Sequence, residues 1–203
     1  MTTDALPGAP PADGRTARAE RTRVAVAEAM LDLLGEGDLR PTAQRVAERA
    51  DVSLRTVFHH YQDMESLLAT AADRQFARMM AMARPVPRIG SLDGRIEAFV
   101  TSRGRLQEAI SPVRRAGLLS EPFSAVIASR LRWIRGRGRL EVERVFAPEL
   151  SARPAVARRE LLEALTAASS WSAWETLRAH QRLSFAGARK VMARTLRALL
   201  KEE

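Results

Sequence analysis

A segment of nine residues, 53–61, combines hydrogen-bond donors with a complete absence of acidic side chains. Its donors include Ser53, Arg55, Thr56 and His59, which fall within two helical turns. Guanidinium, hydroxyl and imidazole groups donate hydrogen bonds to phosphate oxygens and to base edges in the major groove of DNA. Because no carboxylate in the segment repels phosphate, the pattern indicates contact with nucleic acid.

Groups for catalysis or metal binding are scarce by comparison. The chain has no cysteine, which excludes disulfides, thiolate metal sites and a cysteine nucleophile. His59 and His60 would point about 100° apart on a helix and are poorly placed to share a metal ion. The sequence has no Gly-rich phosphate loop and no local acid–base pair. We therefore expect that the protein is not an enzyme and has no cofactor and no metal site. The alternative is an all-α enzyme whose catalytic residues are far apart in the sequence and meet only in the folded structure.

The donor-rich segment is predicted to open the second of two short helices joined by a turn. Thr42 and Ser53 can each cap a helix through the hydroxyl group. Asp51 and Val52 form the turn, where aspartate tolerates a left-handed backbone. Residues 42–61 therefore predict a helix-turn-helix. The expected inner residues of its two helices are Val46, Ala47, Ala50, Val57, Phe58 and Tyr61.

Helices flank this motif on both sides. Residues 15–34 have apolar side chains at helical spacing before Gly35, and Asp63 can cap a further helix. Prolines at 85 and 87 then predict a boundary, followed by helical periods and no strand-like alternation. The later periods cover 92–110, 122–146, 155–180 and 185–200. We predict an all-α fold, divided into a tail (1–14), a helix-turn-helix domain (15–62), a connecting helix (63–84) and a larger helical domain (85–203).

The net charge does not locate a nucleic-acid site. The chain carries +9, from 33 basic and 24 acidic residues. Residues 15–84 contribute 11 arginines against 10 acids, whereas residues 85–203 contribute 22 basic residues against 12 acids. No apolar run is long enough for a membrane span or a signal peptide, so we expect a cytoplasmic protein without a membrane partner.

The stretch VAERADVSLRTVFHHYQDMESLL, residues 46–68, resembles the TetR family of tetracycline-repressor-like regulators. The resemblance extends from residue 15 to the end of the chain, more weakly after residue 85. It implies that the helix after Ser53 reads the major groove and that the C-terminal domain dimerises and holds a small effector. By position, the implied DNA-facing set is Ser53, Leu54, Arg55, Thr56, Phe58, His59 and His60, supported by Thr42, Gln44 and Arg45.

Three positions depart from the family pattern. Asp51 replaces the usual turn glycine, Phe58 stands where tyrosine is common, and Met64 stands where lysine is frequent. The last two remove phosphate-directed groups, so we expect weaker anchoring to the DNA backbone. Arginines at the start of the first helix can offset this loss; they are Arg15, Arg18, Arg21 and Arg23.

Two sets of residues in the C-terminal domain are candidates for the effector and dimer sites. The candidate pocket set, for which a core role is the alternative, is Phe99, Phe123, Ile127, Trp133, Trp171 and Trp174. The candidate dimer set, for which burial within the domain is the alternative, is Leu165, Ala168, Ser172, Ala188, Met192, Thr195 and Leu199. The basic run 130–139 is expected to be a solvated helix face broken by Gly136 and Gly138, rather than a site for an acidic ligand.

The resemblance thus implies a homodimeric, ligand-responsive transcription regulator, and we expect a repressor. Its expected partners are a palindromic double-stranded DNA operator and an apolar or amphipathic effector. The surrounding arginines favour an anionic group on that effector over a cationic one. A constitutive or architectural DNA-binding protein without an effector is the alternative within the same class.

Overall fold

The computed structural model describes residues 14–82 and 85–201, and every regular element within them is helical. The all-α prediction is therefore confirmed. The predicted tail lies outside the described residues except for Gly14, at which the first helix begins. The chain divides into two compact units at Ala71/Ala72. No described helix is long and apolar enough to cross a membrane.

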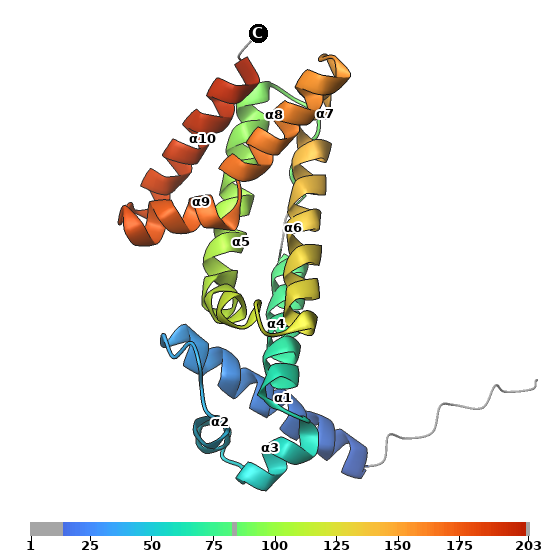
Figure 1. Cartoon of the computed structure of the whole chain (residues 1–203), viewed down its shortest axis with the longest axis vertical. Coiled ribbons are helices and arrows are strands. Elements are labelled where there is room, and N and C mark those ends of the chain that lie inside the picture. Colours follow the sequence, from blue (N-terminus) through green and yellow to red (C-terminus); the bar gives the residue numbers. More distant parts are fainter. Residues whose placement is uncertain (1–13, 83–84, 202–203) are drawn as a thin grey trace, which may run out of the picture. The chain divides into compact units, whose positions relative to one another are not determined.

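The first unit contains the predicted helix-turn-helix. It comprises α1 (Gly14–Gly35), α2 (Ala43–Arg49), α3 (Leu54–His60) and the start of α4 (Met64–Met82) (Figure 1). The Thr42 hydroxyl accepts a hydrogen bond from the backbone N–H of Arg45, and the Ser53 hydroxyl accepts one from Thr56. The Asp63 carboxylate accepts one from Ser66 N–H at 2.7 Å. All three predicted caps are confirmed.

The turn between α2 and α3 depends on one residue in the left-handed region. Asp51 has φ = 52°, as predicted for a turn in which aspartate replaces glycine. Val52 N–H then donates to Ala47 O at 3.0 Å, which closes the turn. Val46, Ala47, Val57 and Tyr61 are buried, whereas Ala50 is half-buried. Phe58 is exposed, so the prediction that it lies on the inner side of α3 was wrong.

The second unit is built around four long helices. They are α5 (Leu92–Ser120), α6 (Ala125–Val145), α8 (Ala155–Ala168) and α10 (Phe185–Lys201), with the short α7 (Ala147–Ser151) after α6. The short α9 (Trp171–Glu175) and the π-helical segment η1 (Thr176–His180) connect α8 to α10. In Figure 1, α9 runs across the direction of α5. The core of this unit includes Ile96, Phe99, Phe146, Leu165 and Trp174.

The helix α5 continues ten residues beyond its predicted end at Ile110, through Pro112. A proline inside a helix costs about 3 kcal/mol because it removes a hydrogen bond and crowds the preceding turn. Beyond Pro112, Arg114, Ala116 and Gly117 are buried. The packing of this segment explains why the helix continues, and the helix bends in its later part (Figure 1).

Two other predictions of helix continuity were wrong, in opposite directions. The period over 155–180 is interrupted at Ser169 and Ser170, where the Ser170 hydroxyl caps α9 by accepting from Ala173 N–H. Conversely, α6 is not broken at Gly136 or Gly138. A Cβ at Gly138 would lie 2.9 Å from the Arg103 guanidinium, which donates to Gly138 O at 3.0 Å. Glycine is present there because another side chain approaches closely.

Candidate nucleic-acid interface

The outer face of α3 presents four residues to solvent. Leu54 and Phe58 are 41% and 48% exposed, and Arg55 and His59 are also exposed. Positions 54 and 58 differ by about one helical turn, as do 55 and 59, so the four side chains form one continuous stripe. Val57, between them, points into the core. The stripe is the surface of α3 that a DNA groove could contact.

Arg55 is the cation available on this stripe. It forms no hydrogen bond or ion pair with any residue that the structure describes. The hydroxyl groups beside it are occupied differently: Ser53 and Thr56 share a hydrogen bond of 2.8 Å between their side chains. This pair fixes the first turn of α3. Ser53 and Thr56 thus position the helix start, while the guanidinium of Arg55 is left to bind an external acceptor.

The two histidines at the end of α3 differ in environment. Their rings meet edge to face with centroids 5.3 Å apart. Burial lowers the pKa of His60, and the neighbouring His59 and Arg23 lower it further. The lowered pKa favours the neutral form of His60, which can donate one hydrogen bond to a phosphate. His59 is the more exposed of the pair.

The predicted supporting residues on α2 make contacts within the chain. Gln44 donates to Glu48 at 2.8 Å, and Arg45 forms an ion pair with Asp38. Thr42 caps the helix. All three residues are exposed. Asp38 therefore competes with a phosphate for the guanidinium of Arg45, whereas Arg55 has no such competitor among the described residues.

Tyr61 ties the motif to α1, a role that the sequence did not indicate. Its hydroxyl donates to Arg23 O at 2.8 Å, and the Arg23 guanidinium lies 5.8 Å from the centre of its ring. The tyrosine is buried at the end of α3. It therefore sets the position of α3 against α1, whose exposed arginines include Arg18 and Arg21.

The fold is shared with two solved structures. A transcriptional regulator from Rhodococcus sp. Rha1 is 17% identical, with a TM-score of 0.66, over 90% of this chain and 96% of that chain. A protein from Pseudomonas aeruginosa PAO1 assigned as a transcriptional regulator is 16% identical, with a TM-score of 0.68, over 89% and 91%. No family model and no curated protein matches the sequence. The similarity supports the same fold over 89–90% of this chain.

The candidate pocket residues are dispersed through the second unit. Phe99 and Trp174 are fully buried in its core, and Ile127 is buried beside Gly117. Phe123 is 86% exposed. Trp133, 54% exposed, packs edge to face on Phe76 and borders a shallow hollow with Asp73, Ser129 and Arg130. Trp171 is half-buried. The structure does not gather these six side chains around one cavity.

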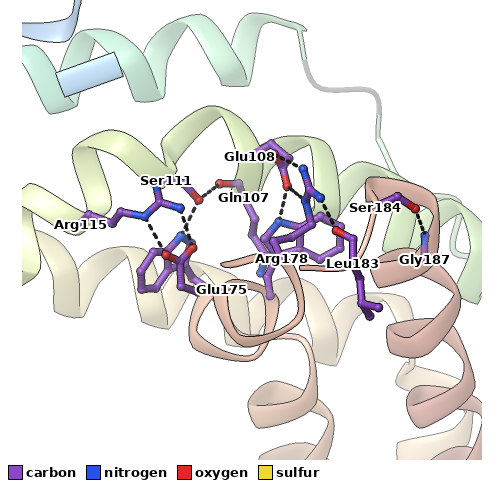
Figure 2. Close-up of polar contacts among 11 residues, drawn as sticks. Gln107, Glu108, Ser111, Arg115, Glu175, Arg178, Leu183, Ser184 and Gly187 are labelled. Atoms are coloured by element: carbon purple, nitrogen blue, oxygen red, sulfur yellow. Dashed lines mark hydrogen bonds and ion pairs between the residues drawn. The ribbon is translucent and has the colours of Figure 1, made fainter. Parts of the chain in front are cut away.

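A second hollow, of about 260 Å³, lies where α9 and η1 meet α5. Figure 2 shows its polar network. Arg115 donates twice to Glu175, at 2.7 and 3.0 Å, and Arg178 donates to Glu108 at 2.5 Å. The Arg178 bond is the largest cause of a lowered pKa of Glu108. The four charged groups neutralise one another and hold α9 and η1 against α5.

The candidate dimer residues separate into two groups. Leu165, Ala188 and Met192 are buried in the core of their own chain, so they have no surface to offer a partner. Their inclusion in an intermolecular seam was wrong, because α8 and α10 use these side chains to pack within the unit. Ala168 and Leu199 are half-buried, and Ser172 and Thr195 are exposed.

Proposed function

We propose that this chain is a DNA-binding transcriptional regulator of the TetR family, and specifically a homodimeric repressor released from its operator by a small molecule. The observation that carries the proposal is the exposed stripe on α3, with an arginine that has no partner among the described residues. The capped helix-turn-helix and the two regulators of the same fold support it. In this proposal, residues 15–62 bind DNA and residues 85–203 bind the effector and dimerise.

The mechanism is a shift between two populations of the dimer. Two copies of α3 reach successive major grooves only when they are about 34–36 Å apart. An effector reduces operator affinity if it binds more tightly to a dimer in which the two α3 helices are at another distance. The size of the reduction is limited by the ratio of the effector's affinities for the two forms of the dimer. A constitutive DNA-binding protein would bind its operator equally well with and without effector.

Replacing Arg55 by alanine is expected to weaken binding to the operator by about 1–3 kcal/mol, because the variant loses a groove contact. The operator is obtained by selection from random DNA duplexes, and affinity is measured by gel shift over a series of salt concentrations. Since Arg55 is exposed and forms no hydrogen bond or ion pair with a described residue, the thermal unfolding of the variant should equal that of the parent.

Arg132→Ala provides the control, because Arg132 is an exposed arginine of the second unit. It should leave operator affinity unchanged. Equal affinity of Arg55→Ala and the parent would remove Arg55 from the interface. A uniform loss across DNA sequences, with a salt slope lower by about 1, would assign it to a phosphate rather than to a base.

The dimer interface is expected on the outer face of α10. Val191, Thr195 and Ala198 are exposed at spacings of four and three residues, so they form one stripe beside the half-buried Leu199. Val191→Arg should produce a monomer in light scattering, because an unpaired charge in an interface is costly. Operator affinity should fall at least tenfold as two half-sites are no longer joined.

Val126→Arg is the matched control, since the two valines are 45% and 40% exposed and lie on different helices. It should leave the parent's oligomeric state unchanged. A parent that is already monomeric at micromolar concentration, or a Val191→Arg variant that remains dimeric, would contradict the proposed interface.

A further inference from the structure

Arg114 is a buried cation with no hydrogen-bond or ion-pair partner among the described residues. It lies on α5, only 8% of it is exposed, and its Nε atom has no hydrogen-bond partner in the described part of the chain. No ion pair or hydrogen bond connects its terminal nitrogens to residues 14–82 or 85–201 either. An unpaired buried charge destabilises a folded protein. Among the described residues, Arg114 contacts the Trp171 ring but is paired with no carboxylate, which suggests an external anion.

The surroundings of Arg114 carry a surplus of positive charge. Glu121 is the carboxylate that acts on it through space, but Arg135 donates two hydrogen bonds to Glu121, at 2.6 and 2.7 Å. Burial is the main cause of a lowered pKa of Arg114, and Arg135 adds to the effect. The three side chains together carry one positive charge. An anion at Arg114 would make this group neutral.

Trp171 provides an apolar wall beside the guanidinium. The Arg114 guanidinium carbon lies 5.7 Å from the centre of the indole ring. The indole N–H donates to the Ser111 hydroxyl at 2.9 Å, and that hydroxyl donates to Gln107 O at 2.7 Å. These two bonds hold the ring in place. The buried Oε1 atom of Gln107, on the same face of α5, also has no donor among the described residues.

Ser111 connects this site to the 260 Å³ hollow, because it both receives the Trp171 N–H and lines the hollow. The charged residues that line the hollow are paired with one another, as Figure 2 shows for Arg115 with Glu175 and Arg178 with Glu108. Arg114 and Trp171 do not line this hollow, but Arg114 lies three residues after Ser111 on α5 and lacks such a pairing.

We propose that Arg114 binds the carboxylate of a small organic acid whose apolar part packs against Trp171. A guanidinium presents parallel donors that match the two oxygens of a carboxylate, and a planar indole accepts an apolar chain or ring. The identification of this acid as the effector rests on the proposed function. The binding site itself does not depend on DNA.

The test uses the full-length protein with benzoate and octanoate as probes, and benzyl alcohol and octanol as their neutral counterparts. In the parent, both carboxylates should raise the melting temperature and quench tryptophan fluorescence, whereas the alcohols should do neither. Arg114→Met should melt at a higher temperature than the parent without probe, because an apolar side chain of similar length replaces an unpaired charge. The same variant should bind the carboxylates at least tenfold more weakly.

Two further variants make the result specific. Trp171→Phe should lose most of the quenching but keep the carboxylate-dependent rise in melting temperature, because the fluorophore beside the site is gone. Arg132→Met, which removes an exposed arginine of α6, should behave as the parent in both measurements.

Three results would overturn the proposal. They are a parent that binds neither carboxylate, alcohols that bind as well as the acids, and an Arg114→Met variant that melts lower than the parent while still binding the probes. Operator binding is measured separately by gel shift. If the parent binds operator but no carboxylate, the Arg114 site is wrong and the proposed DNA-binding function is unaffected. If the parent binds carboxylates through Arg114 but does not bind DNA, the proposed function is wrong and the Arg114 site is supported.

Discussion

Trp174→Ala is expected to lower the free energy of unfolding of the second unit by about 3–5 kcal/mol. Trp174 is fully buried and packs edge to face on Phe185 at 5.6 Å. A Cβ at Gly104 would lie 2.8 Å from its ring, so the ring lies directly against the α5 backbone. The substitution leaves a cavity and removes the indole N–H that donates to Glu108 at 2.9 Å.

The measurement is guanidinium-induced unfolding followed by circular dichroism. Trp133→Ala provides a matched control, because Trp133 is more than half exposed and should cost about 1 kcal/mol or less. The loss in free energy of unfolding for Trp174→Phe should lie between those for Trp174→Ala and Trp133→Ala, since phenylalanine keeps much of the side-chain volume but cannot donate the hydrogen bond to Glu108. A Trp174→Ala variant within 1 kcal/mol of the parent would show that the core collapses to fill the space.

Removal of the Glu149 carboxylate should also lower the free energy of unfolding by about 3–5 kcal/mol. Arg95, 5% exposed, donates to Glu149 Oε2 at 3.0 Å, makes a second bond to Oε1, and donates to Val145 O at 2.7 Å. These bonds fasten the start of α5 to the end of α6 and to α7. Glu149→Ala leaves the guanidinium buried with backbone acceptors only.

Glu163→Ala tests the same chemistry at the surface. Glu163 pairs with Arg139 at 2.8 Å, but its side chain is 60% exposed, so its loss should cost at most about 1 kcal/mol. The double variant Arg95→Met/Glu149→Leu should recover most of the stability that Glu149→Ala loses, because no charge remains buried. If chemical unfolding gave equal losses for Glu149→Ala and Glu163→Ala, the buried pair would have no special role.

The helix-turn-helix could be predicted from the sequence because its determinants are local. The hydroxyl groups of Thr42 and Ser53 bond to backbone groups three residues away, and the left-handed turn at Asp51 depends on the conformation of a single residue. Interactions over so short a distance are encoded in the order of residue types. The exposed position of Arg55 then follows from helical periodicity around Val57.

The second unit depended on contacts between residues far apart in the chain. Packing around Gly117 and Ala116 carries α5 through Pro112, and Met192 is buried because α10 packs on α5 and α8. Arg103, 35 residues before Gly138, explains a glycine that the sequence alone suggested as a helix break. That Arg114 is buried with no paired carboxylate among the described residues is likewise a property of the folded environment. Local spacing cannot encode these outcomes, because burial and pairing are decided by which helix faces meet in three dimensions.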